Sequence, residues 1–139
     1  MARSLERIAY CSHATLSLDS LLVIADILAV SRRNNNRDDL TGSLAYSEGR
    51  FFQVVEGQAV DVDRMMKRVT LDRRHSDILV VSRMPVEGRL FADWSMNAPS
   101  ISPGMAPVLK RAIDDCQDAP TAAIELLRRI TVSDGGHFR

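Results

Sequence analysis

The sequence lacks the features that would direct it to a membrane or to nucleic acid. Its 139 residues carry 18 basic and 18 acidic side chains, so no net charge draws the chain toward polyanions. No apolar run approaches the length of a bilayer span, and the first residues contain no uninterrupted apolar stretch of the signal-peptide kind. We therefore expect a cytoplasmic protein that binds neither nucleic acid nor a membrane.

Cysteine is scarce as well. The two cysteines, Cys11 and Cys116, are separated by most of the chain and belong to no CxxC or Cys/His cluster. Such spacing indicates neither a disulfide framework nor a zinc site. We expect both side chains to pack in the core, and we expect no bound metal.

The hydrophobic periodicity changes several times along a chain of single-domain length. Alternating apolar residues predict strands, and apolar residues three or four apart predict helices. The predicted elements are a strand at 6–12, a helix from 18 that stops at the asparagines 34–36, strands at 40–47 and 50–56 joined by a tight turn at 48–49, a helix around 62–69, and strands at 77–83 and 91–96. This order predicts a ferredoxin-like α+β fold, βαββαββ, with a mixed sheet and both helices on one face.

The C-terminal part of the chain should cover the opposite face of this sheet. The strands at 50–56 and 77–83 are apolar on both sides, and an open face would leave half of those side chains in water. Two amphipathic segments, 105–116 and 121–130, are the remaining material for a second layer. We expect a domain over residues 1–102, a helical extension over 103–132 and a disordered tail over 133–139.

One polar residue interrupts the apolar strand FFQVVEG, residues 51–57. Gln53 needs a hydrogen-bond partner there, because an unpaired buried amide costs about 1 to 3 kcal/mol. It is either a residue at the rim of the sheet or an amide that bridges a second polar group and a ligand, since a carboxamide both donates and accepts. The strand alone leaves both interpretations open.

Five short motifs together resemble one family. They are Tyr10, SRRNN (31–35) with LTG (40–42), FFQVVEG (51–57), DRRH (72–75) and DWSM (93–96). Their order and spacing over residues 4–98 resemble the BLUF family, blue-light sensors of bacteria that use FAD, and the chain resembles its short stand-alone type. The resemblance implies non-covalent FAD between the two helices, with the flavin ring over the central strands. Asp39 departs from the family pattern, which has glycine before the strand.

The resemblance also implies roles for single residues. Tyr10 corresponds to the tyrosine that donates an electron and a proton to the excited flavin, and Gln53 to the glutamine between that tyrosine and the flavin. Trp94 and Met96 correspond to the pair near the flavin that transmits the signal, with no indication of which one faces the ring. The residues that correspond to cofactor contacts are Ser31, Asn34, Asn35, Arg68, Asp72, Arg74 and His75.

These roles imply a photoreceptor that consumes no substrate and is therefore not an enzyme. After light, the hydrogen bonds among Tyr10, Gln53 and the flavin would be rearranged. The C-terminal helices would carry the change to a separate effector protein or to self-association as a homodimer. Two alternatives stay open, a flavin-free interaction module of the same fold and a small flavin-dependent redox enzyme. The colour of the purified protein distinguishes the first of them, and turnover with a reductant distinguishes the second.

Overall fold

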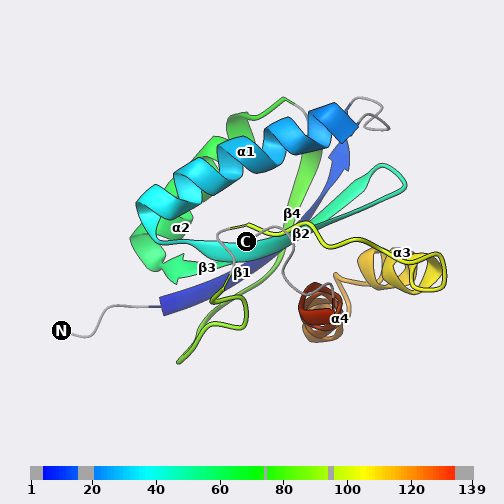
Figure 1. Ribbon diagram of the computed structural model, residues 1–139. Helices are drawn as coiled ribbons and strands as arrows, with labels where there is room; N and C mark the ends of the chain where they lie inside the picture. Colours follow the sequence, from blue (N-terminus) through cyan, green and yellow to red (C-terminus); the bar gives the residue numbers. More distant parts are fainter. Residues whose placement is uncertain (1–4, 16–20, 74, 94–95, 134–139) are drawn as a thin grey trace.

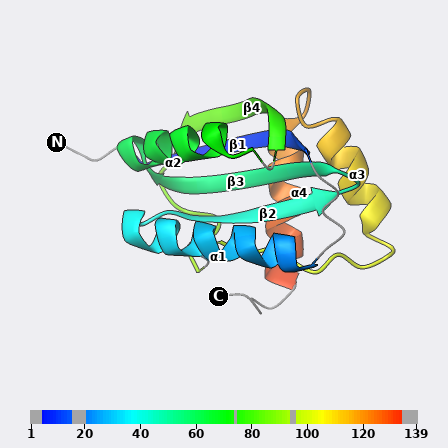
Figure 2. The same ribbon diagram turned by 90° about the horizontal axis from the view of Figure 1, so that it is seen from above.

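The computed structural model describes residues 5–15, 21–73, 75–93 and 96–133. In this part of the chain a four-stranded sheet lies between two layers of helices (Figure 1). The strands are β1 (Leu5–Ala14), β2 (Thr41–Ser47), β3 (Arg50–Gln58) and β4 (His75–Pro85), in the order β2-β3-β1-β4 with antiparallel neighbours. The helices α1 (Leu21–Asp38) and α2 (Ala59–Leu71) cover one face, and α3 (Ala106–Asp114) and α4 (Pro120–Ser133) lie on the other (Figure 2). The predicted ferredoxin-like α+β fold is confirmed, as is the covering role of the C-terminal helices.

The hairpin between β2 and β3 forms as the sequence predicts. Glu48 and Gly49 have φ angles of 47° and 83°, and two left-handed residues in a row make the turn that matches the twist of paired strands. Gly42 then lets the two strands approach, because a Cβ at this position would collide with the carbonyl oxygen of Val54. This hairpin sets the position of Gln53, which lies opposite Leu44.

The prediction that the asparagines 34–36 stop the first helix is wrong. Helix α1 continues through them to Asp38, and Asp39 ends it with a φ of 55°. Aspartate enters the left-handed region more readily than most side chains, and here the turn lets the Leu40 N–H donate to the Asn35 carbonyl at 2.8 Å. Asparagine costs a helix less than about 1 kcal/mol. This small cost does not stop the helix, and Asn35, which is 2% exposed, lies within it at the wall of the cavity.

The predicted fifth strand at 91–96 is also wrong for the residues that the structure describes. Phe91, Ala92 and Asp93 form a bend, and among the described residues from 91 to 97 only Asn97 pairs with the sheet, at a parallel bridge with Ser43. The cause is a buried carboxylate. Glu56 accepts the backbone N–H groups of Leu90 and Phe91, each at 2.8 Å, so these donors are turned toward a side chain and not toward β2. The mixed character of the sheet is limited to this bridge.

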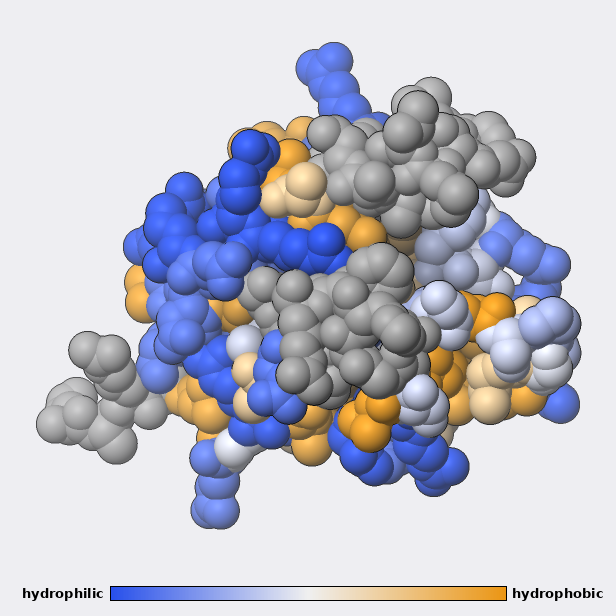
Figure 3. Space-filling view, in the orientation of Figure 1, coloured by the Kyte–Doolittle hydropathy of each residue, from blue (hydrophilic) through white to orange (hydrophobic). Residues whose placement is uncertain are grey.

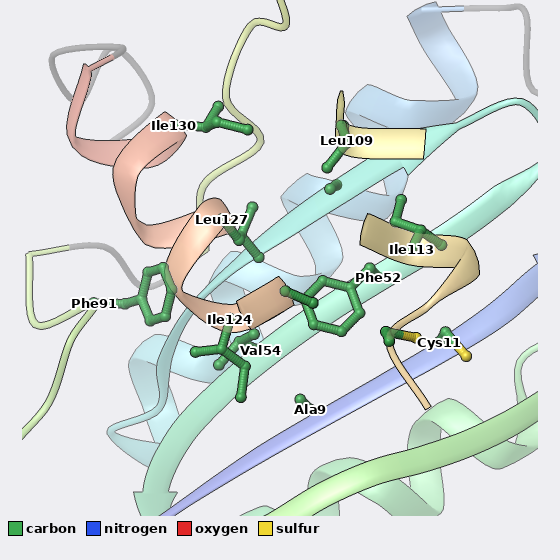
Figure 4. Packing of buried hydrophobic residues seen from close by; sticks show 13 residues of the cluster. Ala9, Cys11, Phe52, Val54, Phe91, Leu109, Ile113, Ile124, Leu127 and Ile130 are labelled. Carbon is green, nitrogen blue, oxygen red and sulfur yellow. The ribbon is translucent and has the colours of Figure 1, made fainter. Parts of the chain in front are cut away.

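Two separate hydrophobic clusters fill the two faces of the sheet. Because neighbouring residues of a strand point to opposite sides, Phe51 and Val55 join the cluster under α1 and α2, whereas Phe52 and Val54 join the one under α3 and α4. Figure 4 shows the second cluster, where residues of α3 and α4 pack over β3. Its labelled members are Ala9, Cys11, Phe52, Val54, Phe91, Leu109, Ile113, Ile124, Leu127 and Ile130.

The edge strand β4 is covered less completely than its sequence predicts. Leu79 and Val80 remain 40% and 44% exposed, because β4 has a neighbour only on the β1 side. Over α3 the surface is apolar in places (Figure 3), and Val108 of that helix is 48% exposed. Strand β3 is therefore buried on both sides, whereas Leu79 and Val80 of β4 stay partly exposed.

The two cysteines pack in the core as expected and lie in the same cluster. Both are free thiols, 3% and 1% exposed. Burial, followed by the neighbouring Cys11, raises the pKa of Cys116 to about 12. Within the described residues there is no group of His, Cys, Asp and Glu side chains suited to holding a metal ion. None of the described helices has both the length and the hydropathy needed to cross a membrane.

Candidate functional site

A cavity lies between the sheet and the pair of helices α1 and α2. Its floor comes from the central strands, and its walls come from one face of each helix. Tyr10 and Gln53 enter it together, because they are directly opposite each other in the β1–β3 ladder and so point to the same face. The residues that line the cavity are Tyr10, Ile27, Val30, Ser31, Asn34, Asn35, Leu44, Phe51, Gln53, Met65, Arg68, Val69 and Asp72.

Both ends of the Gln53 amide have partners. The Tyr10 hydroxyl donates to the Oε1 atom of Gln53, and the Nε2 atom of Gln53 donates to the Sδ atom of Met96 at 3.3 Å. Gln53 is 6% exposed and Tyr10 is 3% exposed, so this chain of contacts is shielded from water. A thioether is a weak acceptor. The amide N–H group is therefore held loosely, while the amide oxygen accepts a hydrogen bond from the Tyr10 hydroxyl.

The environment of Tyr10 keeps its phenol neutral. Burial is the main cause that raises the pKa of Tyr10 above its usual value, and the negative charge of Asp72 adds to the effect. Both causes disfavour a phenolate, the first by desolvation and the second by repulsion. A phenol of this kind can give up its proton only if an electron leaves with it or a base is supplied.

The polar wall of the cavity comes from the last turns of α1. Ser31, Asn34 and Asn35 are three and four residues apart, so they lie on one face of the helix and all line the cavity. They can do so only because α1 continues past the point where the sequence predicted its end. Two amides and a hydroxyl on one wall can donate to and accept from a ligand with carbonyl and imide groups.

Arg68 supplies a cationic donor to the same cavity. Its Nη1 atom lies 3.2 Å from the Oδ2 atom of Asp38, which fixes the guanidinium. Its Nη2 atom is buried and has no partner among the described residues. A buried N–H group without an acceptor is costly. The donor therefore fits a ligand that presents an oxygen at this position.

The lining as a whole suits a flat heterocycle with one polar edge. Val30, Leu44, Met65 and Val69 offer apolar surface, and the amides and Arg68 stand to one side of it. Small-molecule sites combine apolar walls with a few placed polar groups in this way. These residues fit a flavin ring, whose faces are apolar and whose pyrimidine edge carries oxygens and an N–H group.

Most of the residues expected at the site line the cavity, and three fall wholly or partly outside the described part. Ser31, Asn34, Asn35, Arg68 and Asp72 line the cavity together with Tyr10 and Gln53. Arg74 and Trp94 fall outside the described residues. The backbone of His75 begins β4 and pairs with Ala14, but its side chain is outside the described part. Met96 is 1% exposed and packs in the cluster on the cavity side.

Three functional candidates were missed at the sequence level. Arg32 donates from its Nε atom to the carbonyl of Met96 at 3.0 Å and so ties α1 to the segment after the bend. Glu56 holds that bend through hydrogen bonds to its backbone N–H groups. A charged residue inside an apolar strand was the sequence feature that could have indicated this role. Asn97 is completely buried, and no pattern in the sequence pointed to it.

Comparison with known proteins gives consistent matches. A family model described as sensors of blue-light using FAD matches residues 5–97. Photoactivated adenylate cyclase subunit beta of Euglena longa is 32% identical over 96 residues, which cover 68% of this chain and 11% of that protein. The chain thus spans about a tenth of the length of this curated relative.

Solved structures extend the match to the C-terminal helices. The dark-state structure of BlrB, a BLUF protein, is similar with a TM-score of 0.77 and 27% identity, over 96% of this chain and 98% of that one. The structure of a bacterial light-regulated adenylyl cyclase gives a TM-score of 0.73 and 30% identity, over 91% of this chain and 40% of that one.

Proposed function

The chain belongs to the BLUF family, the sensors of blue light using FAD, and on this premise we propose that its cavity binds FAD non-covalently and that Tyr10 and Gln53 form the light-driven switch. The observation that carries the proposal is the hydrogen bond from the Tyr10 hydroxyl to the Gln53 amide inside a cavity with an unpartnered Arg68 donor. These groups can donate to and accept from the polar edge of a flavin.

The cofactor would be held by the polar wall of the cavity. Asn34, Asn35 and Arg68 would bind the oxygen-bearing edge of the ring, and the apolar floor would take its face. Ser31 and Asp72 line the same cavity, and Arg74 and His75 complete the proposed set of contacts. We favour FAD over FMN because the family description names FAD, although one similar solved structure is described with FMN.

When bound, the flavin supplies absorption of blue light and acceptance of one electron. The chain supplies the proton and its return path. Burial and the charge of Asp72 keep the proton on Tyr10, and the hydrogen bond directs it at the Oε1 atom of Gln53. Loss of an electron from the phenol would release this proton to Gln53. Rotation or tautomerisation of the amide would then exchange its donor and acceptor ends, and its weak bond to Met96 offers little resistance.

The output of the switch would lie outside the chain. We propose that the chain is not an enzyme and acts on a separate effector protein or through homodimer formation. The likeness to BlrB, a BLUF protein, over nearly all of both chains supports the sensor role. The cyclase relatives show that BLUF-containing proteins also include enzymes. The domain limits at 102 and 132, the cytoplasmic location and the bacterial origin stay predictions.

One absorption experiment tests the proposal. The purified protein should be yellow, should release FAD on denaturation, and should show a reversible red shift of its absorption after blue light. Tyr10→Phe and Gln53→Leu should each keep the flavin and lose the red shift. Tyr46→Phe is the matched control, because Tyr46 packs against the hydrophobic cluster on the cavity side and does not line the cavity. Colourless protein that cannot be reconstituted with flavin, or a normal red shift in either variant, would overturn the proposal.

A further inference from the structure

A short segment touches both faces of the sheet and so connects the cavity with helix α4. Met96 packs on the cavity side and accepts the N–H group of Gln53. Asn97 follows it and forms the parallel bridge with Ser43 of β2. Its carbonyl accepts the Leu44 N–H at 2.7 Å, and its own N–H donates to the Gly42 carbonyl at 3.1 Å. The Asn97 carbonyl lies near the Ser43 hydroxyl, which contacts Thr131 of α4, so the segment reaches the face opposite to Met96.

Three buried polar groups continue from this bridge to α4. The Ser43 hydroxyl lies 3.4 Å from the Asn97 carbonyl and 2.8 Å from the Thr131 hydroxyl of α4. The Thr131 hydroxyl in turn donates to the Leu127 carbonyl at 2.7 Å. Ser43, Asn97 and Thr131 are all completely buried. One covalent step and a few hydrogen bonds therefore separate the Gln53 amide from the helix on the far face.

The two hydroxyl groups cannot serve all of these contacts at once. A hydroxyl has one hydrogen to donate, so Ser43 and Thr131 have two hydrogens for three contacts. In one arrangement Ser43 donates to Thr131, and Thr131 donates to Leu127. In the other, Ser43 donates to the Asn97 carbonyl, and the Thr131 hydroxyl donates to the Ser43 hydroxyl. The 3.4 Å distance to the Asn97 carbonyl favours the first arrangement in this structure, and a small displacement of that carbonyl decides between the two.

The side chain of Asn97 adds a second reason for two states. Both its Nδ2 and its Oδ1 atom are buried without a partner among the described residues. A buried polar group in this condition gains from any rearrangement that gives it a partner. The rest of the segment is held firmly, since Arg32 binds the Met96 carbonyl from α1. The amide of Asn97 is thus the unsatisfied part of an otherwise ordered connection.

From these contacts we propose that Asn97, Ser43 and Thr131 form a relay that carries the switch at Gln53 to helix α4. The relay rests on the proposed function, because rearrangement of the Gln53 amide is what changes its bond to Met96. Movement of Met96 shifts the Asn97 carbonyl. The Ser43 hydroxyl then changes its acceptor, and Thr131 loses or gains its hydrogen bond to Ser43 of the sheet. One hydrogen bond can change the population of two arrangements by about two- to tenfold. We therefore expect light to change how often the backbone hydrogen bonds of α4 open. We do not expect α4 to detach from the sheet.

Hydrogen exchange of the flavin-loaded full chain, in the dark and under blue light, tests the relay. The wild type should show a light-dependent difference in exchange within 120–133. Thr131→Val keeps the shape of the side chain and removes its hydroxyl, and Ser43→Ala removes the other one. Each variant should keep the red shift and reduce the light–dark difference in α4 several-fold. The double variant should lose no more than either single one, since the groups act in series. Thr121→Val is the matched control, because Thr121 is exposed in the same helix.

The outcomes separate the relay from the function on which it rests. A wild type without a red shift would overturn the proposed function and the relay with it. A wild type that shifts normally but shows no light-dependent exchange in α4 would overturn the relay alone. The same holds if both variants keep the full difference in α4. Circular dichroism in the dark confirms that each variant is folded.

Discussion

Replacing the buried carboxylate of Glu56 by an amide should destabilise the fold by about 3 kcal/mol. Glu56 is completely buried, and its two oxygens accept the Leu90 and Phe91 N–H groups and the Nε atom of Arg7, each at 2.8 Å. In Glu56→Gln, the amide nitrogen must face at least one of these donors. The orientation that costs least leaves the Phe91 N–H unpaired, at about 1 to 3 kcal/mol.

The two remaining bonds weaken because they lose their charge. Hydrogen bonds to a charged group contribute about 1 kcal/mol more than neutral ones. Part of this loss is offset because an amide is cheaper to dehydrate than a carboxylate. Together these effects give the value of about 3 kcal/mol.

Urea unfolding followed by circular dichroism measures this change. At a slope of roughly 2 kcal/mol per molar urea, the midpoint should fall by about 1.5 M. Glu87→Gln is the matched control, since Glu87 is exposed in the same loop, and it should stay within about 0.5 kcal/mol of the wild type. A loss below about 1 kcal/mol in Glu56→Gln would show that the carboxylate does not hold the bend, and the explanation for the missing fifth strand would be wrong.

Three further results are expected. Leu127→Ala should lower stability by about 2 to 5 kcal/mol in the same urea assay, because Leu127 is completely buried between α4 and the sheet, whereas Val132→Ala at a half-exposed site should change it little. Burial and the charge of Asp72 raise the pKa of Tyr10 in the folded state, so the stability from its neutral phenol is fully present below the unfolded pKa of roughly 10 and is lost as the pH rises above it. Tyr10→Phe should therefore reduce the alkaline fall in melting temperature, and an unchanged fall would contradict this. A chain truncated after Ser102 should keep the light-induced red shift but aggregate or associate differently in gel filtration, because it exposes the cluster under α3 and α4; a truncated chain as soluble as the full one would argue against the domain limit at 102.

The features of the fold that depend on local sequence pattern could be predicted from the sequence. Alternation placed Tyr10 and Gln53 on one face of the sheet, and the ladder confirms that they are opposite each other. The turn at 48–49 and the covering helices at the C-terminus also followed from local pattern. These features depend on residues close in sequence, where periodicity and turn chemistry carry the information.

The errors have different physical causes. Helix α1 ends at the left-handed Asp39, where the Leu40 N–H bonds the Asn35 carbonyl, and the bend after β4 exists because Glu56 captures its N–H groups. The second effect has no local signal. Nothing in the spacing of Cys11 and Cys116 showed that they would share a cluster, and the single hydroxyls of Ser43 and Thr131 form no motif.

The separation of the two hydrophobic clusters by one sheet has a consequence for how such a sensor can diverge. Along β3 the odd-numbered residues from Phe51 to Val55 serve the cavity side, and the even-numbered residues Phe52 and Val54 serve the side of α3 and α4. A substitution in the second set changes the packing under α3 and α4 and leaves the side chains that line the cavity in place. The cavity lining and the support of the C-terminal helices can therefore vary at separate positions of one strand, while the contacts among Asn97, Ser43 and Thr131 keep the two layers connected.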